Sequence, residues 1–416
     1  MRHMREASGR ACSKTAGLLL AALTIANAIF ISGAAAVSDG VFESRLLWQS
    51  QIPENPQATP VGILPKSGLI ILSAVSNSPV GDFVGSLDGI AGVFRPMDSG
   101  VKRIFNIEIG IGSFMSTIDS HGNYLIAENT NGAVHWFNHS RMQEANIYRF
   151  SSTGEKISTI KLLRNSQYIA ITDIASTEDE NIVVSYVEND LGWIAMLSRS
   201  GEILWKVRAG LDKGSKISIL SNKIYAIFMD GNADLNVYSE SVYIEILSPD
   251  GRVDGVKLLS KNINNYRHSY FFNVYIYSHD NFIFAVYSWG DHKSLLPLSV
   301  FKLDSDASIV FQNTIDESIV DVVPIFKSVC ASGMMVGHNG DLMLSCASDG
   351  HVRLWRFLAD GSRQLLSKDA YPECSEGIAP RTFIVSPDRA DVWLLGTRMS
   401  GRPEKSCSWL MEFSRR

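Results

Sequence analysis

The stretch SCASDGHVRLWRF, Ser345–Phe357, decides how the rest of this chain is interpreted. It contains two short runs rich in apolar and aromatic residues, separated by the turn-forming pair Asp349 and Gly350. Two such runs around an Asp-Gly pair are typical of a β-hairpin. The question is whether this hairpin occurs once or is one copy of a unit that the whole chain repeats.

The same pattern recurs along the chain. Seven runs with strand character are bounded by Gly, Asp, Asn or Ser: GLIILSAV, GNYLIAE, NIVVSYV, NKIYAIFM, NFIFAVYS, DLMLSCAS and DVWLLGT. Six of them are followed by a hairpin, and the turn residues of these hairpins are Gly100, Gly154, Gly201, Gly251, Ala307 and Gly361. Consecutive turns are 47 to 56 residues apart. This steady period, with four strands in each unit, indicates a β-propeller.

The two ends of the chain supply the seventh unit. Near the start, SRLLWQSQ resembles the strand that follows the turn in GEILWKVRA, and the final SWLMEFSRR resembles the strand before such a turn. We therefore predict an all-β, seven-bladed β-propeller in which Phe42–Gln51 is the outer strand of the last blade, beside Trp409–Ser414. This closure protects sheet edges and ties down both termini. The alternative architecture, two packed β-sandwiches, does not explain the steady period.

One repeat carries a family resemblance. The segment GHNGDLMLSCASDGHVRLWRF, residues 337–357, resembles a WD-repeat blade, with a Gly-His pair, an inner strand, an Asp-Gly turn and the terminal Trp355. Arg356 stands where the usual Asp follows the Trp, and no other blade carries the pattern. The resemblance implies a propeller, and hence often an interaction scaffold, but it names no partner.

The first residues have the pattern of an export signal. Basic residues precede the apolar run AGLLLAALTIANAIFISG, and the small residues AAA follow it. This order predicts a signal peptide over 1–36, a mature chain that starts at Val37, and a single propeller domain over 37–416. The alternative is a membrane anchor, but Asn27 interrupts the run, and no later segment is apolar enough to span a membrane. We expect a monomer that is secreted or periplasmic.

The net charge bears on which partners the protein could bind, and the cysteine content bears on whether it forms disulfides. The net charge is −5, with both signs interspersed, which argues against nucleic acid as the main partner. Beyond the signal there are four cysteines, Cys330, Cys346, Cys374 and Cys407, an even number as expected for an exported chain. If the segment GHNG turns the first two strands of the sixth blade, Cys330 lies opposite Cys346. We predict the disulfides Cys330–Cys346 and Cys374–Cys407, and the alternative is four free thiols.

Candidate site residues lie on loops of the upper face, which holds the connections between second and third strands. Loops on a rigid scaffold carry most binding chemistry. In 128–145, His135 and His139 could bind zinc or copper if the segment is helical, whereas Trp136 suits a lid that packs on neighbouring blades.

Two further loops carry candidate ligands. In SWGDHKS, Trp289 could stack on a sugar or peptide and Asp291 could orient His292 as a base, and the alternative is a solvated loop. In DGNADLN, the oxygen-bearing residues Asp230, Asn232 and Asp234 alternate as in a calcium loop, and the alternative is a plain turn. No cofactor is predicted, although calcium stays open.

Two classes of function remain open. The first is a non-catalytic scaffold that binds a protein, peptide or glycan through its upper loop face. The second is an enzyme at the channel mouth, a hydrolase or lyase that could use a metal. The predicted inner strands contain few acids and histidines, with Asp173 as the clear exception, and this favours the scaffold.

Overall fold

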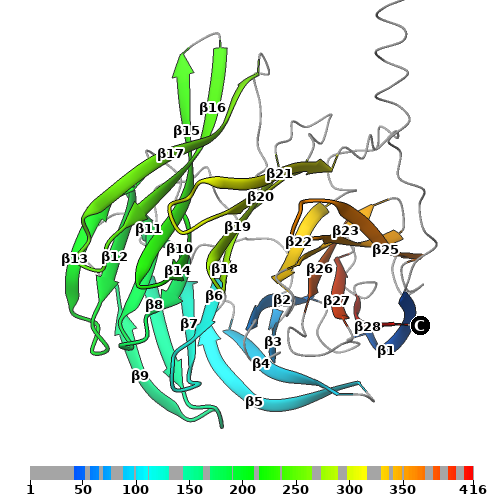
Figure 1. Cartoon of the computed structure of the whole chain (residues 1–416). Helices are drawn as coiled ribbons and strands as arrows, with labels where there is room; N and C mark the ends of the chain where they lie inside the picture. The colour runs from blue at the N-terminus through cyan, green and yellow to red at the C-terminus, as the bar shows by residue number, and fades with distance from the viewer. Residues whose placement is uncertain are drawn as a thin grey trace, which may run out of the picture.

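The computed structural model describes the residues of the strands and of several connecting turns. The described ranges are 42–51, 57–64, 69–75, 88–97, 100–110, 112–130, 144–162, 169–189, 191–209, 215–234, 237–264, 273–288, 298–315, 329–336, 341–348, 351–370, 378–384, 392–399 and 407–415. Within this part of the chain all regular structure is β-strand, arranged in antiparallel four-stranded sheets (Figure 1).

The described strands group into seven sheets, numbered here in chain order. Sheet 1 contains β2 (Gln57–Leu64), β3 (Leu69–Val75), β4 (Asp88–Met97) and β5 (Gly100–Gly110). Sheet 2 contains β6 (Gly112–Ile118), β7 (Tyr124–Thr130), β8 (Glu144–Phe150) and β9 (Lys156–Lys161). Sheet 3 contains β10 (Ile169–Ser176), β11 (Ile182–Glu188), β12 (Leu191–Leu197) and β13 (Ile203–Arg208). Sheet 4 contains β14 (Lys216–Leu220), β15 (Lys223–Asp234), β16 (Val237–Leu247) and β17 (Val253–Asn264).

The remaining sheets follow the same order, except that the last takes a strand from the start of the chain. Sheet 5 contains β18 (Asn273–His279), β19 (Phe282–Ser288), β20 (Leu298–Leu303) and β21 (Ile309–Ile315). Sheet 6 contains β22 (Val329–Val336), β23 (Leu342–Ser348), β24 (His351–Phe357) and β25 (Arg363–Ala370). Sheet 7 contains β26 (Ile378–Ile384), β27 (Val392–Met399), β28 (Cys407–Arg415) and β1 (Phe42–Gln51). In sheet 7, β1 pairs with β28 from Phe42 opposite Arg415 to Gln51 opposite Cys407.

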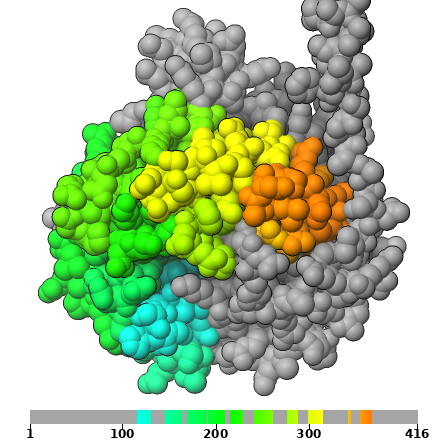
Figure 2. All heavy atoms as spheres, viewed as in Figure 1, coloured from blue at the N-terminus to red at the C-terminus, as the bar shows by residue number. Residues whose placement is uncertain are grey.

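The sheets succeed one another around the molecule. The first strands β2, β6, β10, β14, β18, β22 and β26 contact each other in this order, and β2 also contacts β27 of sheet 7. In the space-filling view, the described side chains form a continuous arc from cyan through green and yellow to orange (Figure 2). All seven strand-like runs of the sequence are second strands of their sheets. Within the described residues, no helix has the length and apolar character of a membrane span.

The core lies between successive sheets. The cluster between sheets 2 and 3 includes Leu125 and Val184, whereas Val183 contributes to the cluster between sheets 3 and 4. Neighbouring residues of β11 therefore face opposite sheets, which is why this strand is apolar along almost its whole length. Equivalent clusters lie between sheets 4 and 5 and between sheets 5 and 6.

The turns between third and fourth strands share one geometry in sheets 2 to 6. In each, the first turn residue donates its amide to the carbonyl four residues later and accepts a bond from the amide three residues later. That third following residue has positive φ, at Gly154, Gly201, Gly251 and Gly361, and also at Ala307, where φ is 54°. The sequence placed Ala307 at this position, and the structure confirms the placement.

These turns also join the sheets. A Cβ atom added at Gly251 of sheet 4 would lie 2.7 Å from the ring of Trp205 in β13 of sheet 3. The turn glycines Gly201 and Gly361 approach Ile160 and Phe311 of the preceding sheet in the same way. Trp205 Nε1 also donates to the Pro249 carbonyl at 2.7 Å. The turns with Gly201, Gly251 and Gly361 therefore pack against the outer strand of the sheet before them.

Sheet 4 corrects one expectation of the sequence. The stretch DGNADLN was expected to be a loop, but β15 continues to Asp234, which pairs with Val237 of β16. β16 in turn pairs with β17 as far as Asn264. The ends of these three strands extend past the neighbouring sheets at the top of the view (Figure 1). Continuous antiparallel pairing overrides the turn preference of the Asp, Asn and Gly residues in this segment.

Candidate functional site

The sequence-predicted loop residues fall in part outside the described structure. His135, Trp136 and His139 lie outside it, as do Trp289, Asp291, His292 and Cys374. Cys330 lies opposite Cys346 in the register of β22 and β23, as the sequence predicted for the backbone. Cys407 is the first residue of β28. Binding and disulfide roles for these residues stay predictions.

The proposed calcium ligands are on a strand. Asp230, Asn232 and Asp234 are alternate residues of β15, so they share one face of the sheet. Alternate residues of a strand are about 6.7 Å apart, which separates the first and third by about 13 Å. The structure therefore places 230–234 on a strand instead of in a loop, and calcium binding by these residues stays a prediction.

A polar group on the inner strands joins sheets 3 and 4. Asp173 of β10 accepts hydrogen bonds from the amide of Ile217 at 2.8 Å and from its neighbour Ile174 at 3.0 Å. Lys216 of β14 donates to the Thr172 carbonyl at 2.6 Å, and its Nζ lies 3.9 Å from the sulfur of Met115. Burial raises the pKa of the Asp173 carboxyl above its ordinary value, while Lys216 and the two amides act in the opposite direction.

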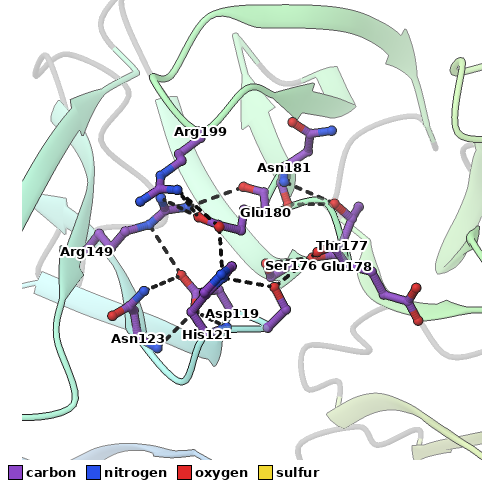
Figure 3. A network of polar contacts seen from close by, with 11 residues as sticks. Asp119, His121, Asn123, Arg149, Ser176, Thr177, Glu178, Glu180, Asn181 and Arg199 are labelled. Carbon is purple, nitrogen blue, oxygen red and sulfur yellow. Dashed lines mark hydrogen bonds and ion pairs between the residues drawn. The ribbon is translucent and has the colours of Figure 1, made fainter.

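An extensive polar network lies at the end of sheets 2 and 3 where the turns after first and third strands are located (Figure 3). Its centre is Arg149 of β8, and this residue is only 2% exposed. Arg149 Nη1 is 3.4 Å from Glu180 Oε2, and Nη2 donates to the Glu180 carbonyl at 3.3 Å. Arg149 Nε is 3.6 Å from Asp119 Oδ2. One guanidinium thus lies between carboxylates of two sheets.

Two exposed residues extend this network to the surface. Arg199, in the turn after β12, places Nη1 at 2.9 and 3.1 Å from the two carboxylate oxygens of Glu180. His121 Nδ1 lies 2.8 Å from Glu180 Oε1. Figure 3 shows the side chains of Arg149, Arg199 and His121 converging on Glu180. Both carboxylate oxygens of Glu180 therefore contact nitrogen atoms of neighbouring side chains: Oε1 contacts Arg199 and His121, and Oε2 contacts Arg149 and Arg199.

The turn after β6 holds the second carboxylate in place. Asp119 Oδ1 accepts hydrogen bonds from the amides of His121 at 3.0 Å and Asn123 at 2.9 Å, and Oδ2 accepts one from the Asn123 side chain at 3.0 Å. A side chain that bonds the backbone two residues ahead forms an Asx-turn, a geometry that Asp favours. Local chemistry therefore fixes the position of this carboxylate beside Arg149.

A basic residue recurs at the same position in other sheets. Arg149, Lys302 and Arg356 are each the residue before last in the third strand. Arg356 Nε donates to Asp341 at 2.8 Å. Burial lowers the pKa of Lys302, and Asp341 opposes this. The sequence contains this signal in NIYRF, SVFKL and LWRF, but it is visible only once the repeats are aligned by their turns.

A surface pocket adjoins the network. It has a volume of about 430 Å³ and is lined by Arg149, Ile157, Ser158, Ser198, Arg199 and Ser200. The lining comes from β8 and β9 of sheet 2 and from the turn after β12 of sheet 3. Sequence reasoning missed this pocket because it considered only the upper loops.

A second cluster lies at the opposite end of sheet 3. Lys206 of β13 donates to Glu188 at 2.5 Å, and its Nζ lies 3.9 Å from the ring centre of Trp193. Burial lowers the pKa of Lys206, but the contacts with Glu188 and Tyr186 outweigh it and raise the pKa above the ordinary value. These contacts satisfy the ammonium and indicate a structural role. Among the described residues no group of three or more His, Cys, Asp or Glu is arranged to hold a metal ion.

Comparisons with known proteins give a general similarity only. No protein-family model and no curated protein matches this chain. Similar solved structures include a protein of unknown function from Dyadobacter fermentans, with 10% identity over 89% of this chain and 98% of that chain and a TM-score of 0.44. Another is a chain of the Saccharomyces cerevisiae complex of Dbp5 with Nup159 and Gle1, with 11% identity, 91% and 96% coverage and a TM-score of 0.46. A bat subtype N10 neuraminidase-like protein has 10% identity, 72% and 93% coverage and a TM-score of 0.42. At these values neither a family nor a function follows.

Proposed function

We propose that residues 37–416 form one seven-bladed β-propeller that is exported and acts as a non-catalytic binding scaffold. In this proposal each four-stranded sheet is a blade, and β1 completes the last blade beside β28. The succession of contacts between first strands, together with the contact of β2 with β27, supports a closed ring. The signal-like segment 1–36 supports a secreted or periplasmic location.

The observation that carries the scaffold proposal is how the inner strands use their polar groups. Asp173 and Lys216 bond backbone groups of the adjacent sheet. Ser218 of β14 donates to Ser278 of β18 at 2.9 Å, and Ser278 donates to the Ile219 carbonyl at 2.6 Å. These groups hold blades together, and a rigid framework of this kind suits variable binding loops.

The binding face in this proposal is the upper one, where the loops with Trp136 and Trp289 begin and end. Tryptophan offers a large apolar face with a polar N–H, which suits a peptide or glycan partner. The WD-repeat resemblance of residues 337–357 supports an interaction role without identifying the partner.

Site-specific photo-crosslinking tests the scaffold proposal. A photoreactive amino acid at position 136 or 289 of the mature chain, expressed in its source cells, is expected to capture a defined protein or glycoprotein. The same amino acid at the exposed Asp306, in the turn after β20 of sheet 5 and away from sheets 2 and 3, serves as the control. Equal labelling from all three positions, or no labelled product, would contradict binding by the upper face.

The alternative function is an enzyme at the channel mouth. The raised pKa of Asp173, with Lys216 on the adjacent inner strand, is the observation that favours it. Metal analysis of the purified mature chain and a screen against hydrolase and lyase substrates test this alternative. Turnover that Asp173→Asn abolishes, with an unchanged melting temperature, would favour the enzyme over the scaffold.

A further inference from the structure

The pocket between sheets 2 and 3 has an uneven supply of hydrogen-bond donors and acceptors. Arg199 engages only Nη1 among the described contacts, and its side chain is 63% exposed. The Arg149 Nε is buried, and it lies 3.6 Å from Asp119 Oδ2, so it is not a donor open to the pocket. The side-chain hydroxyl of Ser158 makes no hydrogen bond to another described residue, although its backbone pairs with Arg149. The pocket therefore presents the remaining N–H groups of Arg199 and the hydroxyl of Ser158 without a protein acceptor among the described residues.

The nearby acceptors are already occupied. Glu180 accepts from Arg149 and Arg199 and contacts His121, and Asp119 accepts three hydrogen bonds from its own turn. Pocket donors that have no protein acceptor bind water or a ligand instead. A ligand that supplies oxygen acceptors would complete this pocket.

The charges of the side chains around the pocket limit how much negative charge a ligand can carry. Two guanidinium groups, Arg149 and Arg199, face two carboxylates, Asp119 and Glu180, so their charges balance. The exposed His121 adds at most one positive charge. A single carboxylate can share Arg199 at low electrostatic cost, whereas a doubly charged phosphate would lie close to Glu180 with little compensation.

The pocket wall adds an apolar component. Ile157 of β9 is 47% exposed and lines the pocket, and β9 is the outermost strand of sheet 2. The carbon chain of a Glu side chain could pack on Ile157 while its carboxylate reaches Arg199 and Ser158. An extended peptide beside an edge strand also gains main-chain hydrogen bonds.

We propose that this pocket binds the carboxylate side chain of an acidic, extended peptide segment from a protein partner, with Arg199 and Ser158 as the main donors. The site lies at the lower end of sheets 2 and 3, opposite the upper loops, so it goes beyond the proposed scaffold function and does not depend on the upper face.

Equilibrium binding of short probes tests the proposal. The probes are capped heptapeptides Thr-Val-Thr-Glu-Thr-Val-Thr with an uncharged fluorophore, and the same peptides with Gln or phosphoserine in the central position. For the full mature chain we expect the Glu peptide to bind at least about tenfold more tightly than the Gln peptide, because only the carboxylate forms charge-assisted bonds with Arg199. Arg199→Ala should remove this difference, and Ser158→Ala should reduce it.

The control variant is Arg208→Ala, which removes an exposed arginine at the opposite end of β13 and should leave the difference intact. Equal binding of the Glu and Gln peptides, or equal losses in the Arg199 and Arg208 variants, would overturn the proposal. Tighter binding of the phosphoserine peptide would also overturn it, since the cluster would then prefer a dianion. None of these outcomes bears on crosslinking from positions 136 and 289, so the two proposals fail separately.

Discussion

At the scale of single residues, Glu245 of β16 shows the cost of a buried carboxyl group. It is 6% exposed, and its Oε2 has no hydrogen-bond partner. Its cross-strand neighbour Ala226 belongs to the core between sheets 3 and 4, so Glu245 faces sheet 3. Burial raises the pKa of Glu245 from 4.5 to about 7. The folded state therefore binds a proton that the unfolded state releases near its lower pKa.

Glu245→Gln should change the pH dependence of stability. Because the folded pKa is the higher one, the native chain loses stability as pH rises from 4.5 to about 7, and the cost stays constant above that. The full pKa shift corresponds to about 3 kcal/mol of unfolding free energy. At pH 8 we expect Glu245→Gln to recover about 1–2 kcal/mol of this cost relative to pH 5, because effective dielectric constants at protein sites are high. Urea unfolding at pH 5 and pH 8 checks this. If the difference in unfolding free energy between Glu245→Gln and the unchanged chain is the same at pH 8 and at pH 5, the prediction of a buried charge at Glu245 is wrong.

At the scale of elements, the turns between third and fourth strands explain the regular spacing of glycines. Gly251 has φ of 84° and lies against Trp205, so Gly251→Ala adds both left-handed strain and a clash. We expect a loss of about 2–4 kcal/mol. Ala307 already has φ of 54° and is 2% exposed, so in Ala307→Gly the relieved strain and the lost methyl burial nearly cancel. Its stability should change by less than about 1 kcal/mol. Chemical unfolding of both variants checks the contrast, and similar losses would contradict it.

The register of β22 and β23 sharpens the disulfide prediction. Cys330 is directly opposite Cys346, and such positions have Cβ atoms about 4.5–5.5 Å apart, near the separation that a disulfide needs. In the chain-entropy model, closing this short loop stabilises the fold by about 3 kcal/mol. Peptide mapping without reduction should recover a Cys330–Cys346 pair from exported protein. A Cys330–Cys374 link, or four thiols that can be alkylated in the folded chain, would show that the pairing is wrong.

The repeat explains which elements the sequence could predict. Apolar runs such as NIVVSYV and turn residues such as Gly201 act locally, so strands and hairpins followed from the sequence. The extension of β15 did not, because Asp230 and Asn232 favour turns and only pairing with β16 makes them strand residues. The Arg149 network was also missed, since Asp119, Arg149 and Glu180 come from three separate turns and strands. Contacts between sheets leave a signal only when repeats are compared.

At the scale of the whole molecule, the pairing of β1 with β28 joins the two ends of the described chain. The register runs from Phe42 opposite Arg415 to Gln51 opposite Cys407, with one bulge between Leu46 and Trp48. Without β1, sheet 7 would have three strands, and β28 would present an unpaired edge. The proposed closed ring therefore depends on a strand that is remote in sequence from the rest of its sheet.

Removal of β1 tests this dependence. A chain that begins at Ile52 should lose about 3 kcal/mol or more of unfolding free energy, on the scale of ~1 kcal/mol net per ladder hydrogen bond. It should also tend to associate through the free edge of β28. The synthetic peptide Phe42–Gln51, added in excess, should restore stability by binding the folded form, because a ligand of the native state stabilises it by mass action. A peptide with the same composition in scrambled order is the control. If the shortened chain is as stable as the mature chain and neither peptide changes its melting temperature, the ring does not depend on β1 and the proposed closure is wrong.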